Sequence, residues 1–328
     1  MVTQKREEIN WLRGFAAFLV VLGHSIIVFP VNLHEIPWCK WLYDTIYAFH
    51  MPLFFAISGY CFSMRGGYCA YLIKKAKRLL VPYCVFAFGG LIPRLLLPAL
   101  INGSEPLGTS IVNIIFHGGE YWFLYTLFII FAIFPAVIKA YEKNSWVTMV
   151  MIVGLGALSN LVPDYFCLPS VLYYTVPFTM GYLGKKKNVF SSKCVIGRIG
   201  TGRFRRIIVG VISCVVYLVC GYLHGKYNVA GLNLLEAILC IVVCYVISLL
   251  FPPVLSRFGK YSDYSLALYL LNGYFLVVSR MVIVNMIKVS NPIIIIVGNM
   301  IFDFYVSYLL IRFALSKIPV VRSMIGIR

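Results

Sequence analysis

Long apolar runs, separated by short polar stretches, make up most of this chain. A helix needs about 20 mostly apolar residues to cross a bilayer, and most of the runs come close to that length. The fifth and sixth runs are shorter and fit tilted or re-entrant helices. The pattern predicts an all-α polytopic membrane protein with about ten transmembrane helices, over 11–29, 46–64, 79–100, 121–138, 146–161, 171–183, 207–223, 232–251, 262–282 and 292–315.

The composition supports this class and excludes others. Of the 328 residues, 61% are hydrophobic and 12% are charged, whereas a soluble globular chain has about 45–50% apolar and about 25% charged residues. A multi-domain soluble enzyme and a disordered chain are therefore excluded. The ten cysteines are scattered without a C-x-x-C pair, which argues against a disulfide scaffold and predicts no metal site. We expect one membrane-embedded domain over residues 1–328, without a fused soluble domain.

Basic residues are distributed unevenly between the loops. The chain has 29 Lys and Arg against 11 Asp and Glu, a net charge of +18. With ten spans, one set of alternate loops holds nearly all of these basic residues, and the opposite loops hold only Lys40, Lys226 and Lys288. Cytoplasmic loops carry such an excess, so both termini are predicted to be cytoplasmic. The surplus charge then orients the chain in the lipid bilayer, and no nucleic-acid partner is predicted.

Ionisable residues in or beside the apolar runs are the candidates for chemistry, because a charge there needs a partner, a cavity or a function. Arg13 and His24 are eleven positions apart, which places them about 16 Å apart on nearly the same side of a helix. Successive spans run in opposite directions through the bilayer, starting from a cytoplasmic N-terminus. Arg13 is therefore expected near the cytoplasmic side, and Asp303 near the middle of its span. The residues expected in the outer half are His24, His50, Arg94, Glu120, Glu236 and Arg280.

This distribution suits a reaction between a donor that enters from the cytoplasm and an acceptor met near the outer face. Histidine is the natural general base, because its ordinary pKa is near neutral. A collar of basic residues is expected at the cytoplasmic side, and it consists of Arg13, Lys74, Lys75, Lys77 and Arg78. Such a collar would bind the phosphate groups of a phosphorylated donor.

Each of these residues also has a structural interpretation, and spacing alone does not choose between the two. Buried histidines form hydrogen bonds between helices, and a basic loop can contact anionic lipid. Arg94 or Arg280 could extend to the outer headgroups. Glu236, Arg280 and Asp303 could form ion pairs. The aromatic residues could serve only as anchors at the membrane interface; these are Tyr43, Tyr47, Tyr121 and Trp122.

Five segments resemble the acyltransferase-3 family of membrane acyltransferases. The first helix of that family carries an Arg, ten intervening residues and a His, which Arg13 and His24 match. The other segments follow in the family's order and are 49–60 (FHMPLFFAISGY), 74–83 (KKAKRLLVPY), 121–124 (YWFL) and 259–271, which begins Gly-Lys and ends SLALYLL. Two departures are visible. The family's Arg-x-x-Arg is Lys75-x-x-Arg78 here, and Asn272 replaces the late-helix His, so a base at that position is lost.

The resemblance implies transfer of an acyl group, preferentially acetyl, from cytoplasmic acyl-CoA to a sugar hydroxyl of a cell-surface or exported glycan. Acetyl-CoA would be a co-substrate, and no permanently bound cofactor is expected. The acceptor would be a glycan or a lipid-linked oligosaccharide, and the location a bacterial plasma (inner) membrane. The expected catalytic residues are His24, Arg13, His50 and Glu120; those for acyl-CoA are Arg13, Lys74, Lys75 and Arg78; those for the acceptor are Tyr121, Trp122, Arg94 and Glu236.

Two other functions remain open at this stage. A transporter or exporter of a polar solute or polysaccharide would also use buried His, Glu and Arg residues. Paired broken helices in the two halves would support that function, but the prolines crowd the first half of the chain instead. A structural membrane subunit without chemistry is the third possibility, and it predicts that His24 and His50 tolerate replacement by Leu.

Overall fold

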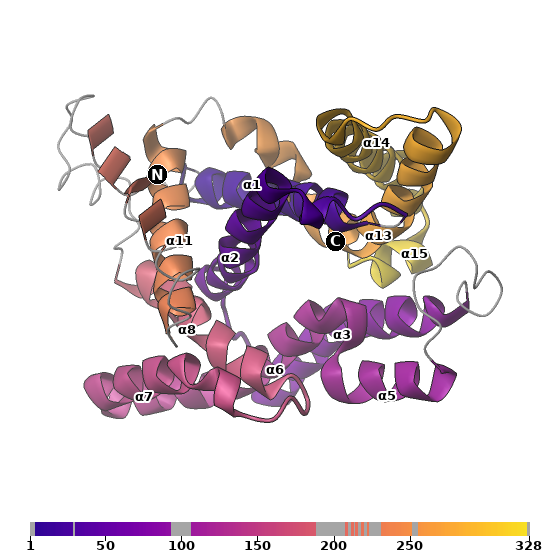
Figure 1. Cartoon of the computed structure of the whole chain (residues 1–328). Helices are drawn as coiled ribbons and strands as arrows, with labels where there is room; N and C mark the ends of the chain where they lie inside the picture. Colours follow the sequence, from indigo (N-terminus) through magenta and orange to yellow (C-terminus); the bar gives the residue numbers. More distant parts are fainter. Residues whose placement is uncertain are drawn as a thin grey trace. The chain divides into compact units, whose positions relative to one another are not determined.

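The computed structural model describes a helical protein, and Figure 1 shows its arrangement along the chain. It describes residues 4–28, 30–92, 106–187, 231–250 and 255–326, with short pieces between 207 and 222, and this part of the chain contains no strand. The elements are α1 (Gln4–Ile27), η1 (Leu33–Glu35), α2 (Pro37–Tyr60), α3 (Tyr68–Gly89), α5 (Leu107–His117), η3 (Gly119–Tyr121), α6 (Trp122–Lys143), α7 (Ser145–Ala157), η4 (Ser159–Leu161), α8 (Leu168–Lys186), α11 (Leu232–Leu250), η5 (Ser256–Tyr264), α13 (Ser265–Met281), η6 (Val282–Met286), α14 (Pro292–Phe313), η7 (Leu315–Lys317) and α15 (Pro319–Met324).

The helical class predicted from the sequence is confirmed for these residues. Long, apolar helical stretches that could cross a membrane number four in the described part, namely Glu7–Ile27, Leu107–Lys143, Ser256–Met286 and Pro292–Lys317. Each contains or largely overlaps a predicted span. The seventh predicted span, 207–223, lies mostly outside the described residues. The count of ten spans, the single domain and the cytoplasmic termini stay predictions.

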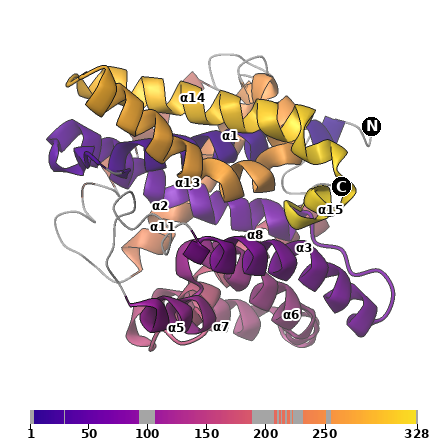
Figure 2. The ribbon, with the colours of Figure 1, turned by 90° about the vertical axis from the view of Figure 1, so that its right-hand side faces the viewer.

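The described chain forms two compact units. Unit 1 comprises Met1–Phe62 and Pro177–Leu309, and unit 2 comprises Ser63–Val176 and Leu310–Arg328. In unit 1, α1 packs against α2, η5, α11 and α13, and α2 also packs against α11. Helix α14 runs alongside α13 (Figure 2), where the Ser279 hydroxyl donates to the Asn299 side-chain oxygen at 3.1 Å. Unit 1 is therefore a bundle built around α1.

Glycines allow the helices of unit 1 to approach backbone to backbone. A methyl group on Gly59 of α2 would overlap the carbonyl of Phe178 of α8, and one on Gly181 would overlap the carbonyl of Ala56. A methyl group on Gly14 of α1 would likewise overlap the carbonyl of Phe258 in η5. Small residues at such contacts are the usual means of close helix packing in membranes. These contacts fix α2 and η5 against their neighbours.

The end of α1 and the start of α2 share a small apolar core. Ile26, Leu33 and Cys39 are buried there together with Ile295 and Ile296 of α14. Leu33 belongs to η1, the short 3₁₀ turn that connects the two helices. Pro37 then occupies the first turn of α2, where its missing N–H is not needed. The connection between the helices is thus anchored by burial.

In unit 2, α3 packs against α5, α6 and α15, and α6 packs against α7. Pro135 lies inside α6 and cannot donate a hydrogen bond to the carbonyl one turn earlier, that of Phe131. The hydroxyl of Tyr71, on α3, donates to this carbonyl at 3.1 Å, and that of Tyr68 donates to the carbonyl of Ala132 at 3.0 Å. The two tyrosines therefore join α3 to α6 where the proline leaves an acceptor unpaired.

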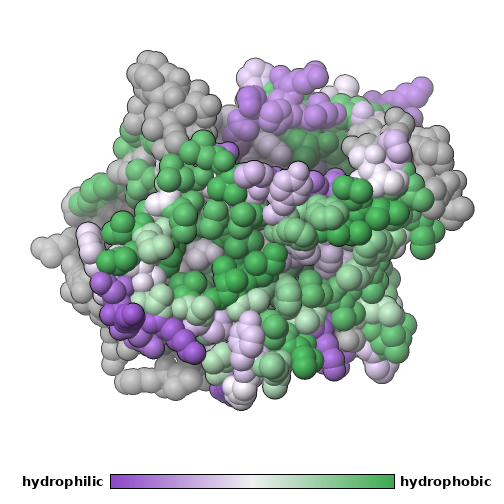
Figure 3. Space-filling model, turned by 90° about the horizontal axis from the view of Figure 1, so that it is seen from below, coloured by the Kyte–Doolittle hydropathy of each residue, from purple (hydrophilic) through white to green (hydrophobic). Residues whose placement is uncertain are grey.

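Apolar side chains also cover much of the surface. In Figure 3 hydrophobic residues make up much of the face in view, with polar residues between them. The exposed apolar residues include Met151 and Leu155 on α7 and Ile293, Ile301 and Leu309 on α14. Patches of this extent on a soluble monomer would promote aggregation. Together with the long apolar helices, they indicate that lipid surrounds this protein.

The glycine contacts predict a specific pattern of stability. Gly59→Ala and Gly181→Ala should each lower the stability of the detergent-purified protein by about 1–3 kcal/mol, because the added methyl forces the backbones of α2 and α8 apart. Gly154→Ala on α7 is the matched control, since nothing lies within 4 Å of an added methyl there. Thermal unfolding followed by size-exclusion chromatography measures the difference. Equal melting temperatures for all three variants would contradict the proposed close packing.

Candidate functional site

Helix α1 carries both residues of the predicted Arg–His pair, and it is unbroken from Gln4 to Ile27. The partly exposed Arg13 side chain lies at the C-terminal end of α2, where Nη2 donates to Sγ of Cys61 at 3.2 Å. Cys61 is the C-cap residue of that helix. The C-terminal end of a helix carries partial negative charge, which favours a cation. Helix α2 therefore fixes the position of Arg13.

His24 and His50 have the same local geometry on neighbouring helices. Nδ1 of His24 lies 2.8 Å from the carbonyl oxygen of Val20, and Nδ1 of His50 lies 2.8 Å from that of Ile46. A carbonyl oxygen only accepts hydrogen bonds, so Nδ1 carries the hydrogen and the lone pair of the neutral ring is on Nε2. Each ring therefore presents Nε2 as the nitrogen that can take up a proton.

Tyr47 connects the two histidines. Its ring centroid lies 6.0 Å from that of His24 and 4.7 Å from that of His50, and it stacks on Tyr43 at 3.8 Å. Gly23 makes room for the ring, because a Cβ there would lie 2.8 Å from Cε2 of Tyr47. His50 is almost fully buried, whereas His24 is half-buried. Helices α1 and α2 thus bring both imidazoles to one aromatic cluster.

Arg280 attaches α13 to the C-terminal end of α1. Its guanidinium is fully buried, donates from Nη1 to the carbonyl of Val31 at 2.6 Å and donates from Nη2 to the carbonyl of Ser25. The last carbonyls of a helix have no partner within the helix, and Ser25 directly follows His24. The interpretation of Arg280 as a side chain that extends to the headgroups is therefore wrong, since none of it is exposed.

The basic residues of α3, in unit 2, differ in their surroundings. Lys74 and Arg78 are exposed. Lys75 is partly buried, and its Nζ lies 3.5 Å from the centroid of the Phe131 ring, where a cation is attracted by the aromatic face. The exposed cations of the collar are therefore Lys74, Lys77 and Arg78, and Lys75 packs against α6.

The predicted acceptor residues of unit 2 are partly occupied by protein contacts. Tyr121 is buried, with its ring 5.9 Å from that of Phe86. One face of Trp122 stacks on Tyr174 at a centroid distance of 5.5 Å. Glu120, in η3, is exposed. These three residues belong to unit 2 and His24 to unit 1, and their service in the same reaction stays a prediction.

The remaining predicted residues have different outcomes. Glu236 is buried on α11, which packs against α1 and α2. Asp303 is fully buried on α14 and has no ion-pair partner among the described residues. Arg280 donates to backbone carbonyls, so an ion pair between it and Asp303 is not formed. Arg94 lies outside the residues that the structure describes.

Comparison with known proteins decides the family. A family model described as an acyltransferase domain matches residues 6–315. The chain belongs to this acyltransferase family. It is 28% identical to nodulation protein NolL of Sinorhizobium fredii over 181 residues, which are 53% of this chain and 47% of that protein. NolL of Mesorhizobium japonicum is 26% identical over 183 residues, 53% of this chain and 46% of that protein. The match thus spans less than half of either relative. No solved structure matches the chain.

The sequence of this acyltransferase did not predict the contacts of Tyr43 and Tyr47. Tyr43 and Tyr47 had the alternative interpretation of interface anchors. They stack on each other, and the Tyr47 ring lies beside both His24 and His50. A signal was present, because Tyr43, Tyr47 and His50 follow the spacing of four and three residues that places side chains on one face of a helix. That this face meets His24 depends on how α1 and α2 pack.

A cavity of about 560 Å³ lies on another side of α1 in the acyltransferase. It is lined by Phe18, Phe304 and residues of η5 that include Arg257 and Lys260. Phe18 follows Arg13 by five residues, which is about 140° around the helix. This cavity therefore does not lie on the side of α1 that carries Arg13 and His24.

The hydrogen bonds of Arg280 predict a large loss of stability on its replacement. Arg280→Met should lower the melting temperature of the purified acyltransferase, because the buried carbonyl of Ser25 loses its donor at a cost of about 1–3 kcal/mol, and the carbonyl of Val31 loses one as well. Arg322→Met is the control, since Arg322 is an exposed arginine on α15. Thermal unfolding in detergent measures both variants. The same melting temperature for the two variants would contradict the role of Arg280.

Proposed function

We propose that this acyltransferase moves an acetyl group from cytoplasmic acetyl-CoA to a sugar hydroxyl of a cell-surface or exported glycan, in the plasma membrane of a bacterium. The family membership supports acyl transfer. The observation that carries the proposal is the placement of Arg13 and His24 on one unbroken helix, with His50 beside His24. This arrangement provides a cation for the donor and two bases for the acceptor.

In this mechanism His24 is the general base. Its Nε2 takes the proton of the acceptor hydroxyl as the hydroxyl oxygen attacks the thioester carbonyl. The carbon–sulfur bond then breaks, and the thiolate of CoA receives the proton back from the imidazolium. The carbonyl of Val20 keeps the hydrogen on Nδ1, so Nε2 is the nitrogen that works. Attack of Nε2 itself on the thioester, with a transient acetyl-histidine, is the variant of this mechanism.

His50 would orient the acceptor or adjust the basicity of His24 through Tyr47. The rings of both histidines lie beside the same tyrosine ring, which is the connection between them. The burial of His50 favours its neutral form, which can accept a hydrogen bond from a hydroxyl at Nε2. Glu120 is assigned the same supporting role for the acceptor, and Tyr121, Trp122, Arg94 and Glu236 are assigned to acceptor binding.

Arg13 would bind the pantetheine or phosphate region of acyl-CoA, about 16 Å along α1 from His24. Its Nη2 donates to Sγ of Cys61, and a guanidinium has five N–H donors, so donors remain for an anionic ligand. Lys74, Lys75 and Arg78 are assigned to the phosphates at the entrance. Because Lys75 lies over Phe131, we expect Lys74 and Arg78 to contribute more than Lys75.

Removal of the base should abolish the reaction without unfolding the protein. His24→Gln keeps the size and polarity of the side chain but removes the basic nitrogen, so transfer should fall by at least about 10²–10⁴-fold. The assay is incorporation of label from radioactive acetyl-CoA into glycan extracted from a strain that lacks this gene. Size-exclusion chromatography checks that the variant is folded. Substantial retained transfer would remove His24 from the mechanism.

The collar residues should differ in their effect on the donor. Lys74→Gln with Arg78→Gln should raise the half-saturating concentration of acetyl-CoA about tenfold or more, since each charge-assisted hydrogen bond to phosphate contributes on the order of 1.5–3 kcal/mol. Lys75→Gln should change that concentration less and lower the melting temperature more, because its ammonium contacts Phe131. The reverse order of the two variants would contradict this assignment.

A further inference from the structure

None of the predicted site residues that the structure describes lines the cavity of about 560 Å³ in unit 1, which lies between α1, η5 and α14. Ring contacts join the inner part of its lining. The centroid of the Phe18 ring lies 5.3 Å from that of Phe258 and 5.9 Å from that of Phe304, and the Phe304 ring lies 4.6 Å from that of Tyr261. Ile301, which also lines the cavity, is 49% exposed. The cavity is therefore held in shape by protein contacts and is open at the surface.

Two cations on η5, Arg257 and Lys260, line this cavity. Both side chains are exposed, and neither forms an ion pair with a carboxylate in the described part of the chain. A 3₁₀ helix has three residues per turn, so side chains three positions apart lie on the same side of it. Nζ of Lys260 lies 4.9 Å from the centroid of the Tyr261 ring, which orients the ammonium without neutralising it. Two positive charges are thus directed to one side of η5.

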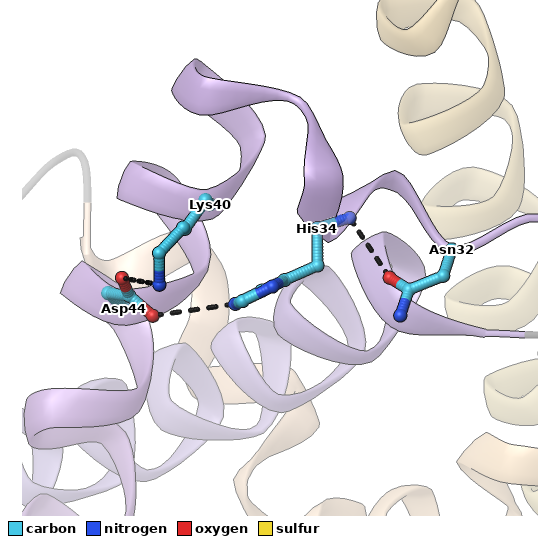
Figure 4. A network of polar contacts seen from close by, with 4 residues as sticks. All are labelled: Asn32, His34, Lys40 and Asp44. Atoms are coloured by element: carbon cyan, nitrogen blue, oxygen red, sulfur yellow. Dashed lines mark hydrogen bonds and ion pairs between the residues drawn. The ribbon is translucent and has the colours of Figure 1, made fainter.

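The exposed Lys40, at the start of α2, is paired in a way that Arg257 and Lys260 are not. Figure 4 shows that Nζ of Lys40 donates to Oδ2 of Asp44, at 2.9 Å. Nε2 of His34 lies 3.6 Å from Oδ1 of the same carboxylate. The charge of Lys40 is therefore balanced within the protein. Arg257 and Lys260 have no such carboxylate among the described residues, so their charges remain for a ligand.

The wall of the cavity that α14 supplies is largely apolar, with Met300, Ile301 and Phe304 in its lining. An exposed apolar face continues from it along the helix. Ile301, Val297 and Ile294 are separated by four and three residues, which places them on one face of α14, and they are 49%, 43% and 56% exposed. This face extends about 10 Å from Ile301 to Ile294. The cavity thus joins a pair of cations to a surface that suits an acyl chain.

An anionic phospholipid carries both matching groups, a phosphate and acyl chains. The loop that holds Arg257 and Lys260 is predicted to be cytoplasmic, and anionic lipids give the cytoplasmic leaflet its negative surface potential. A zwitterionic lipid fits less well, because its own cationic group would lie near the two charges. Acyl-CoA is also anionic, but Phe18 places the cavity on another side of α1 from Arg13 and His24. The lining and the location together therefore favour the anionic phospholipid.

We propose that this cavity binds an anionic phospholipid, whose phosphate contacts Arg257 and Lys260 and whose acyl chain follows Ile301 along α14. The lipid then bridges η5 and α14. Because the carbonyl of Phe258 in η5 packs directly on Gly14 of α1, the bound lipid also holds η5 against α1. This site goes beyond the proposed function, since acyl transfer assigns no role to either cation or to the cavity.

Loss of the two charges should weaken lipid binding. The full-length protein, purified in detergent and freed of lipid, is mixed with phosphatidylglycerol, and native mass spectrometry measures the affinity for the first bound lipid. Arg257→Gln with Lys260→Gln should weaken this affinity about tenfold or more, because two attractive charges are lost. Lys139→Gln with Lys143→Gln is the matched control, since both are exposed lysines of α6 and their loss changes the net charge equally. The control should stay within about twofold of the wild type, because exposed charges outside the cavity are screened by salt.

A second pair of variants tests the apolar wall without a change of charge. Ile301→Trp places a larger side chain in the cavity and should also weaken phosphatidylglycerol binding about tenfold. Its control is Ile133→Trp, since Ile133 is a similarly exposed isoleucine of α6, at 40% against 49%. Phosphatidylcholine should bind the wild type at least about tenfold more weakly than phosphatidylglycerol does. Size-exclusion chromatography checks that all variants are folded.

Unchanged phosphatidylglycerol binding in either the Arg257→Gln, Lys260→Gln variant or Ile301→Trp would overturn the lipid site, as would equally tight binding of phosphatidylcholine. Displacement of the lipid by glycerol 3-phosphate at equal concentration would also overturn it, because that compound carries the phosphate without acyl chains and would identify a site for small anions. Displacement by acetyl-CoA would assign the cavity to the donor instead and would contradict the lipid as its ligand.

Discussion

In an apolar environment every imidazole N–H must find an acceptor, and at His24 and His50 the acceptor is the backbone carbonyl one helical turn earlier. This constraint determines the chemistry of the site, because it assigns the hydrogen to Nδ1 and the basic lone pair to Nε2. No carboxylate is required to orient either ring. The helix backbone orients the rings instead, and no charged group has to be buried in the membrane, where a charge is costly.

Two other contacts fix the helices that carry His24 and His50. Gly59 and Gly181 let α2 and α8 pack backbone to backbone. The guanidinium of Arg280 donates a hydrogen bond to the carbonyl of Ser25, the residue after His24. The first contact fixes the helix that carries His50, and the second fixes the end of the helix that carries His24. The relative position of the two imidazoles therefore depends on close backbone packing at the glycines and on the buried guanidinium of Arg280.

The sequence predicted the parts of this account that depend on spacing within one helix. A separation of eleven positions places Arg13 and His24 on one side of α1, and the apolar runs predict the helices themselves. Contacts between remote segments could not be predicted in this way. Arg280 bonds to carbonyls 249 and 255 residues away, and the position of Lys75 over Phe131 is invisible in a pattern that records only charge. The stacked tyrosines depend likewise on how α1 meets α2.

The proposed mechanism requires acyl-CoA to lie along the side of α1 that carries Arg13 and His24. An electron-microscopy structure of the full chain with a thioether analogue of acetyl-CoA tests it most directly. In that structure the phosphate or pantetheine region should contact Arg13, and the sulfur should lie within reach of Nε2 of His24. An analogue bound on the other side of α1, in the cavity lined by Phe18 and η5, would contradict it.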